Sequence, residues 1–173
     1  TTFLQDKSNI LNFLDEFEYY GLTNIELGSN HIFDKNIFNY NFQKFDILVH
    51  NHFPPSINSI ILNIASNREE IRNESLNHIY KSILFSKKNN SKLYTFHPGF
   101  NEDPISPNKN LNNYDFIWEN KRINNTNEDI FFRSLEKIIL FAKKNDQRIA
   151  IETEGSVNHS DKLLMQNLVD LNN

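Results

Sequence analysis

The segment "FDILVHNHFPP", residues 45–55, decides how this chain is expected to fold. Its apolar run predicts a strand buried inside the protein, and Pro54 and Pro55 end that strand because proline offers no backbone N–H donor. Two histidines, His50 and His52, stand where the strand ends. Imidazole is a common metal ligand. The segment therefore indicates a core strand with reactive chemistry at its carboxyl end.

Strands and helices alternate on both sides of this segment. With it, the short apolar runs predict strands near 23–28, 46–51, 92–97 and 148–153. Apolar residues at helical spacing predict helices over 5–19, 57–89, 127–145 and 160–171, whereas 30–44 is too irregular to assign and 100–126 has the composition of a long loop. Such alternation is typical of a parallel sheet covered by helices, either an open doubly wound sheet or a (β/α) barrel.

Polar side chains recur at the ends of three predicted strands. Because side chains alternate along a strand, His50, His97 and Glu152 each fall on the face opposite the large apolar groups. The carboxyl ends of parallel strands are where such folds build their sites. A shared divalent cation would offset the cost of burying these groups. We therefore expect the three side chains to lie close together at one end of the sheet.

His52 and Glu154 have the same parity as His50 and Glu152, but each lies two residues further along the chain. A chain bends after a strand ends, so a hydrogen-bonded packing role remains open for both. The same ordinary role is the alternative for any single histidine at a strand end.

Composition narrows the classes of protein and partner. The 173 residues contain no cysteine, so a metal would be held by His, Asp, Glu or water. No apolar run is long enough to span a bilayer, which makes a membrane partner unexpected and a cytoplasmic location the default. The net charge of −4 is the opposite of what most nucleic-acid-binding surfaces require, so nucleic acid is not an expected partner.

Four segments in combination carry a resemblance to a known superfamily: "VHNHFPPS", "ILNIASNREEIRNESLNHIYKSILFSKK", "KLYTFHPGF" and "IAIETEGS". Together they resemble the xylose isomerase-like TIM barrels. This superfamily of sugar isomerases and epimerases also contains the endonuclease IV type of AP endonuclease (AP endonuclease family 2). In these proteins a strand-end His precedes an N-L-A-S segment, here residues 63–66, and a helix with a Ser, a strand ending in H-P-G and a strand ending in Glu follow.

The resemblance runs over about residues 22–160 and implies an α/β fold, a (β/α)8 TIM barrel of which this chain holds about strands 2 to 5. We expect residues 1–173 to be one domain, a partial barrel. A full barrel takes about 250 residues. Strand one and strands six to eight would therefore be absent, and we expect the sequence to be part of a longer protein.

The resemblance also implies roles for the strand-end residues. His50, His97 and Glu152 would be metal ligands or substrate-pocket residues, with metal binding the role assigned to them here, and Glu152 would also act in proton transfer. His52 and Glu154 would lie in the substrate pocket. The implied cofactor is a divalent metal, Mn or Zn.

The function implied is a metal-dependent sugar or sugar-phosphate isomerase or epimerase of carbohydrate metabolism, with a small-molecule sugar as partner; a homo-oligomer is compatible with the sequence. One alternative is an endonuclease IV-type AP endonuclease that hydrolyses DNA phosphodiesters, and another is a non-catalytic barrel remnant. The "HNHFPP" motif is closer to sugar-phosphate isomerase-like proteins than to the nucleases. A nuclease should need basic loop residues over the barrel mouth, whereas the loops of this chain are Asn-rich and nearly neutral.

Overall fold

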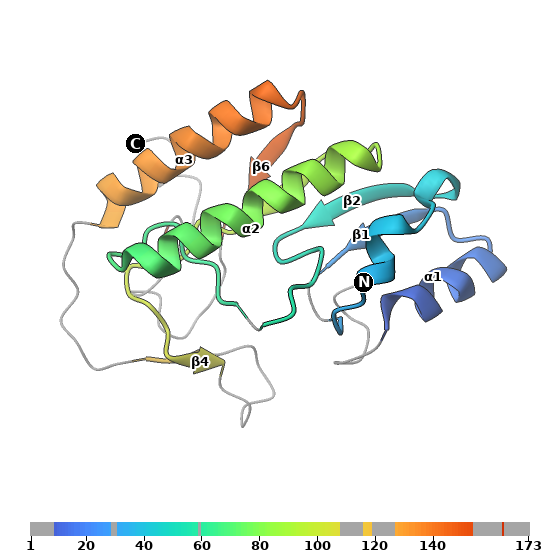
Figure 1. Cartoon of the computed structure of the whole chain (residues 1–173), viewed down its shortest axis with the longest axis horizontal. Helices are drawn as coiled ribbons and strands as arrows, with labels where there is room; N and C mark the ends of the chain where they lie inside the picture. Colours follow the sequence, from blue (N-terminus) through green and yellow to red (C-terminus); the bar gives the residue numbers. More distant parts are fainter. Residues whose placement is uncertain are drawn as a thin grey trace. The chain divides into compact units, whose positions relative to one another are not determined.

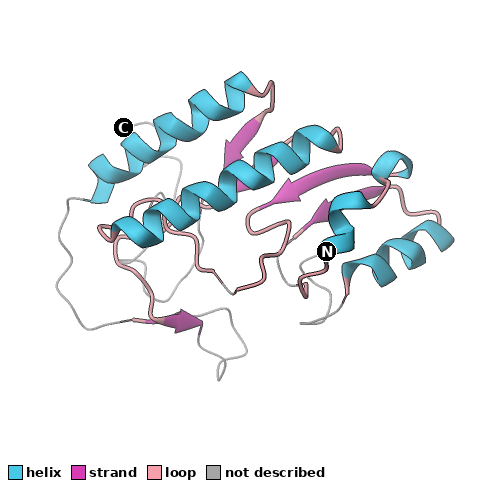
Figure 2. Cartoon of the chain, viewed as in Figure 1, coloured by secondary structure: helices cyan, strands magenta, loops and turns pink. Residues whose placement is uncertain are grey.

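A computed structural model of the chain describes residues 9–28, 31–58, 60–107, 116–118, 127–153 and 164. Helices and strands follow one another along the chain (Figures 1 and 2). In order they are α1 (Ile10–Tyr19), β1 (Asn24–Leu27), η1 (Lys35–Asn39), η2 (Phe42–Lys44), β2 (Asp46–His50), α2 (Glu69–Lys88), β3 (Tyr94–Phe96), β4 (Ser106–Pro107), β5 (Phe116–Ile117), α3 (Asn127–Lys144) and β6 (Ile149–Ile151), where η denotes a short 3-10 helix.

The chain divides into two compact units. The first comprises Thr1–Ile60, Asn77–Phe96 and Ile138–Ala150, and the second comprises Ile61–Leu76, His97–Lys137 and Ile151–Asn173. The expectation that residues 1–173 form a single domain stays a prediction.

A four-stranded parallel sheet organises the first unit, in the order β1-β2-β3-β6. Strands β1 and β2 pair in parallel, with Ile25 opposite Ile47, and β2 pairs with β3 in parallel, with Val49 opposite Tyr94. The parallel α/β architecture expected from the sequence is confirmed. All four main strands lie within one or two residues of their predicted positions.

Aromatic rings from several elements form the core of the first unit. Phe85 of α2 makes edge-to-face contacts with Phe38, Phe42 and Phe53, at centroid distances of 6.2, 5.7 and 5.5 Å. Phe38 is 38% exposed, and the other three rings are buried. Each buried phenylalanine contributes about 1.5–3 kcal/mol relative to an exposed one. Tyr80 of α2 stacks on Phe141 of α3, with ring centroids 4.3 Å apart. Figure 1 shows α2 and α3 running side by side.

Helix α1 ends at Tyr19, the predicted end, and Gly21 follows two residues later. Gly21 has φ of +69°, and the backbone N–H of Leu22 donates to the Phe17 carbonyl at 2.8 Å, which closes the last turn. Residues 5–8 of the predicted helix lie outside the described residues. The segment 30–44, which the sequence left unassigned, contains η1 and η2.

The predicted start of the second helix at residue 57 is wrong, because α2 begins at Glu69. Side chains in the preceding segment bind backbone N–H groups that a helix would use. Asn63 Oδ1 accepts from the Ala65 N–H at 3.1 Å, and Ser66 Oγ accepts from the Arg68 N–H at 3.0 Å. Short polar side chains that bond to the local backbone compete with helix formation. The helical spacing of apolar residues extends through this segment although the segment is not helical, and the predicted start of the helix was therefore too early.

The second unit contains the predicted long loop and the first part of α3 (Asn127–Lys144). Within that loop β4 and β5 pair antiparallel, with Ser106 opposite Ile117, a pairing that the sequence did not indicate. Phe100 and Trp118 meet edge to face at 5.4 Å. Leu164 is the only described residue of the predicted helix over 160–171, so that prediction lies outside the described residues. Among the described helices, none is long and apolar enough to cross a membrane.

His78 on α2 gives the fold a testable pH dependence. Its side chain is 6% exposed, and this burial lowers the pKa to about 4, although a hydrogen bond to the His52 backbone acts in the opposite direction. The unfolded chain takes up this proton below about pH 6.5, whereas the native state does so only near pH 4, so stability falls as the pH falls through this window.

We predict that the wild-type protein loses stability between about pH 7 and pH 4.5 and that this loss is about 2–3 kcal/mol smaller in His78→Leu. The measurement is urea-induced unfolding of both proteins at the two pH values. The change in the free energy of unfolding between the two pH values is compared for the two proteins, so that the contributions of the remaining histidines cancel. An identical loss of stability in both proteins would show that His78 is not the titrating group.

Candidate metal centre

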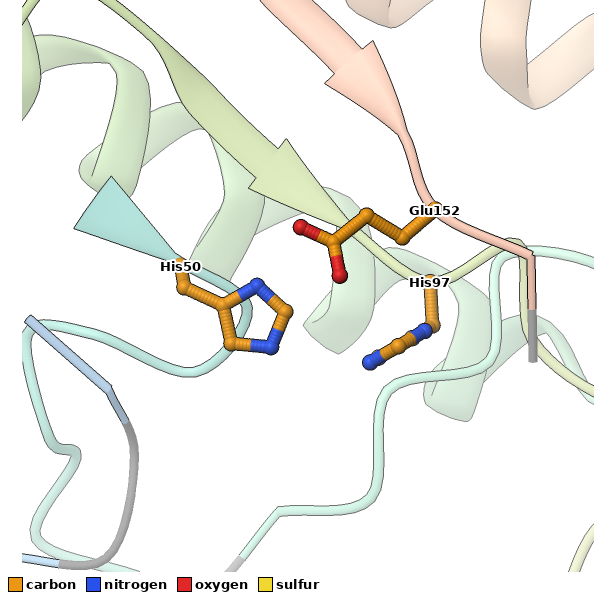
Figure 3. Close-up of side chains that lie close together, drawn as sticks. All are labelled: His50, His97 and Glu152. Carbon is orange, nitrogen blue, oxygen red and sulfur yellow. The ribbon is translucent and has the colours of Figure 1, made fainter. Parts of the chain in front are cut away.

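Three strands of the sheet end in a residue that could bind a metal. His50 is the last residue of β2, His97 directly follows β3, and Glu152 directly follows β6. One ligand atom from each lies within 4.8 Å of the other two, and all three residues are half-buried. Figure 3 shows both imidazole rings and the carboxylate pointing toward one another. The expected proximity of these side chains is confirmed, whereas their roles stay predictions.

The alternation along β2 explains how His50 reaches this position. Ile47 and Val49 are buried on one face of the strand, whereas Leu48 and His50 are half-buried on the other. The sheet therefore packs its apolar side chains on one face and presents His50 on the other.

The donor set fits a divalent cation. Two imidazole nitrogens and a carboxylate oxygen are ligands that Zn²⁺ and Mn²⁺ accept. Ligand atoms around a tetrahedral zinc ion lie about 3.3 Å apart, as bonds of about 2.0–2.2 Å require. The upper limit of 4.8 Å is thus within reach of a common ion after small side-chain rotations.

His52 does not join the three residues. Asn51 has φ of +48°, a left-handed conformation that interrupts the strand alternation directly after His50. The His52 ring lies 6.2 Å from the ring of His78 on α2 and is half-buried. A substrate-binding role for His52 stays a prediction. Glu154, the other residue expected in the substrate pocket, lies outside the described residues.

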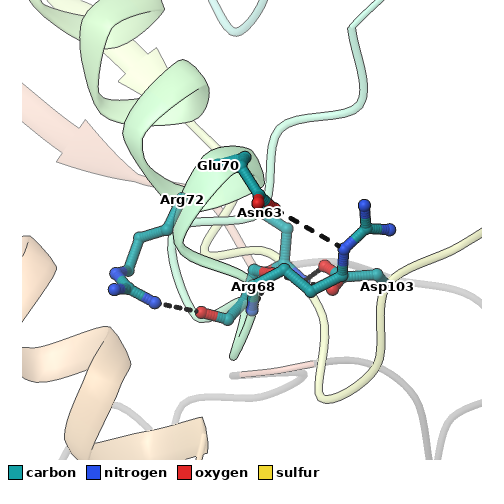
Figure 4. Close-up of polar contacts among 6 residues, drawn as sticks. Asn63, Arg68, Glu70, Arg72 and Asp103 are labelled. Carbon is teal, nitrogen blue, oxygen red and sulfur yellow. Dashed lines mark hydrogen bonds and ion pairs between the residues drawn. The ribbon is translucent and has the colours of Figure 1, made fainter.

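Asn63 anchors the loop that follows His97, a role that strand periodicity did not reveal. Its side chain is 1% exposed, and Oδ1 accepts from the Phe100 N–H at 3.0 Å as well as from Ala65. Its Nδ2 donates to Asp103 at 2.8 Å (Figure 4). The sequence indicates Asn63 only as the first residue of the N-L-A-S segment, and no sequence pattern indicates Asp103.

Serine hydroxyls complete the bonding around this segment. Ser66 Oγ donates to the second Asp103 oxygen at 2.7 Å. Ser75 Oγ accepts from the Asn63 N–H at 2.9 Å, and it donates to the Ile71 carbonyl at 2.7 Å. The serine of the helix motif is therefore explained by its bond to the segment that precedes the helix.

Two arginines border the same segment in Figure 4. Arg72 Nη1 donates to the Ser66 carbonyl at 2.7 Å and so supports the turn before α2. Arg68 and Glu70 form a 4.0 Å ion pair in which both side chains are exposed. Exposed pairs of this kind contribute little to stability.

Gly99 is required by this close packing. Its φ is +104°, and a Cβ at this position would lie 2.6 Å from Asn63 Oδ1 and 3.3 Å from Asn63 Cα. A side chain at position 99 would therefore clash with the Asn63 side chain and crowd the Asn63 backbone. The glycine of the H-P-G motif lets the loop after His97 approach Asn63 closely enough for the Phe100 hydrogen bond.

Comparisons with solved structures identify the fold. No protein-family model and no curated protein matches the sequence. A D-tagatose 3-epimerase-like protein matches 86% of this chain and 48% of its own length, with a TM-score of 0.56 and 20% identity. An Anabaena variabilis protein assigned provisionally as a sugar phosphate isomerase/epimerase matches 94% of this chain and 53% of its own, with a TM-score of 0.50 and 14% identity.

The fold of this chain is therefore that of a partial TIM barrel, similar to about half of each of these two proteins. It spans about half the length of the two solved structures. The partial barrel that the sequence predicted is thereby confirmed, and the open doubly wound sheet is set aside. Identities of 20% and 14% support the fold alone.

Among the described residues, Gly21 and Gly99 are the glycines with positive φ, and alanine at each compares the effect of a close contact with that of backbone strain alone. A Cβ on Gly21, where φ is +69°, would meet nothing within 4 Å, so Gly21→Ala adds strain without a clash. We predict that Gly21→Ala costs about 1–2 kcal/mol and that Gly99→Ala costs at least about 1 kcal/mol more. Urea-induced unfolding of both variants measures the difference. Equal losses would mean that the approach of Gly99 to Asn63 is not needed for stability.

Proposed function

We propose that the protein is a divalent-metal-dependent isomerase or epimerase of sugars or sugar phosphates. In this proposal His50, His97 and Glu152 hold Mn²⁺ or Zn²⁺, and Glu152 also transfers a proton. The observation that carries it is the approach of these three ligand atoms to within 4.8 Å at the carboxyl end of the sheet. That end is where barrels of this architecture place their catalytic groups.

The chemistry asks two things of the three residues. A bound divalent ion would polarise a carbonyl and the adjacent hydroxyl of the sugar, which acidifies the intervening C–H bond. Glu152 has two carboxylate oxygens, so one could serve as ligand while the other takes the proton from carbon and returns it to the neighbouring carbon, with the hydroxyl proton passing to the carbonyl oxygen. Epimerisation would also need a second acid on the opposite face of the sugar. His50 and His97 would orient the site without taking part in this transfer.

The solved structures support the choice of substrate class. One is described as D-tagatose 3-epimerase-like, and the other is assigned provisionally to sugar phosphates. A small-molecule sugar as partner, a role in carbohydrate metabolism and a cytoplasmic location belong to the same proposal. Because the chain spans about half of each solved structure, the activity of the whole protein is part of it too. Contacts of His52 and Glu154 with substrate also remain proposals.

Metal binding can be tested without any knowledge of the substrate. We predict that the protein binds Zn²⁺ or Mn²⁺ and that Glu152→Gln and His97→Ala each weaken binding at least about ten-fold, since each removes a ligand. Isothermal titration calorimetry measures the affinities. His52→Gln is the matched control, because it changes a nearby histidine that lies outside the group of three. Equal weakening by the control would argue against the assigned ligands.

Turnover tests the reaction. We predict that Glu152→Gln abolishes interconversion of sugars or sugar phosphates in the presence of Mn²⁺ or Zn²⁺ while the far-UV circular dichroism spectrum is unchanged. The amide keeps the shape of the side chain and loses its basicity and charge. His50→Ala should reduce turnover as strongly if His50 binds the metal, and less if it contacts only the substrate.

An abasic-site DNA duplex, assayed in parallel, separates the alternatives. Metal-dependent incision that is lost in Glu152→Gln, with no sugar turned over, would establish the endonuclease IV-type activity instead. Inactivity of the verified full-length wild-type protein in both assays would favour the non-catalytic barrel.

A further inference from the structure

A side chain of the neighbouring strand holds the His50 imidazole. Nδ1 of His50 lies 2.8 Å from Oγ1 of Thr95, whose side chain is only 9% exposed. His50 and Thr95 are register partners in the parallel pairing of β2 with β3. Paired residues on adjacent strands face the same side of a sheet, so this contact is built into the strand pairing.

The turn after His50 is tied to the same strand. The Asn51 N–H donates to the Thr95 carbonyl at 2.7 Å, and the Tyr94 hydroxyl donates to the Asn51 carbonyl at 2.9 Å. These bonds hold Asn51 in its left-handed conformation and tie the backbone directly after His50 to the strand that carries Thr95. Thr95 is also β-branched, which restricts its χ1 rotation and keeps the hydroxyl directed at the ring.

The tautomer of His50 decides whether its outer nitrogen can bind a metal. A neutral imidazole carries a proton on one nitrogen and a lone pair on the other. If the Thr95 hydroxyl accepts from Nδ1–H, the lone pair resides on Nε2 and is available to a cation. If the hydroxyl donates to Nδ1, Nε2 carries the proton and cannot be a ligand. The same 2.8 Å contact is compatible with either arrangement.

We propose that Thr95 is a positioning residue for His50: its hydroxyl accepts a hydrogen bond from Nδ1–H and thereby keeps the Nε2 lone pair directed toward His97 and Glu152. Ligand histidines commonly donate their other N–H to such a partner, which fixes the ring orientation and raises ligand basicity. Thr95 is not one of the three proposed ligands. Its role in directing the His50 lone pair rests on the metal site of the proposed function.

The tautomer can be measured in the metal-free protein. Long-range ¹H–¹⁵N spectra of the labelled protein at about pH 8, above the ordinary histidine pKa, distinguish the two nitrogens of each ring. His50→Gln identifies the His50 signals by their loss. We expect Nδ1–H in the wild-type protein and a shift toward Nε2–H in Thr95→Val, which keeps the shape and removes the acceptor. Wild-type His50 already in the Nε2–H form, or no shift in Thr95→Val, would overturn the proposal.

Two further variants separate positioning from a general effect on folding. Thr95→Ser retains the hydroxyl and should restore the wild-type tautomer. Ser91→Ala is the matched control, because Ser91 Oγ donates to the Ile47 carbonyl at 3.1 Å, so the change removes a buried hydroxyl between the same strands, away from His50. A shift of the His50 tautomer in Ser91→Ala as large as in Thr95→Val would overturn the specific role of Thr95.

Titration with Co²⁺, followed by its visible absorption bands, tests the purpose of this contact. We expect Thr95→Val to bind Co²⁺ about 10- to 100-fold more weakly than wild type, with Thr95→Ser close to wild type. Unchanged affinity in Thr95→Val would overturn the proposal even if the tautomer shifts. If the wild-type protein binds no Co²⁺, Zn²⁺ or Mn²⁺, the proposed function fails, whereas the tautomer measured without metal still decides how Thr95 acts on His50.

Discussion

The parallel register of β2 and β3 is the constraint on which the candidate site depends. It places Val49 opposite Tyr94 and His50 opposite Thr95, so that both strands end at the same edge of the sheet. His97 then follows its strand at the point where His50 ends the neighbouring one. A shift of one residue would turn His50 to the opposite face, which carries the apolar side chains. The buried Ile47 and Val49 resist such a shift because it would expose them.

The sequence contains enough information to predict the sheet and the three polar strand ends. Strands β1, β2, β3 and β6 have short apolar runs, and parity alone placed His50, His97 and Glu152 on one face. Alternation holds only while the chain stays extended. The left-handed conformation of Asn51 interrupts it, and this is why parity could not place His52.

Contacts between distant loops could not be predicted from local patterns. Asn63 bonds to Phe100 and Asp103, which lie 37 and 40 residues further along the chain. Periodicity reports which face of an element is apolar and contains no information about such polar partners. The error at the start of α2 has the same origin, since the apolar spacing continues through residues whose side chains bond to the local backbone. A buried polar group that loses its partner costs about 1–3 kcal/mol, so these bonds matter even though no pattern announces them.

Tyr94 extends the range of conditions over which the strand ends stay connected. Burial raises the pKa of its phenol above the ordinary value, and a hydrogen bond with Ser82 opposes this only partly. The hydroxyl therefore remains protonated in alkaline solution, where an exposed tyrosine would become an anion and lose its donor. Its bond to the Asn51 carbonyl requires this proton. The support beneath His50 therefore does not depend on a group that titrates where exposed tyrosines do.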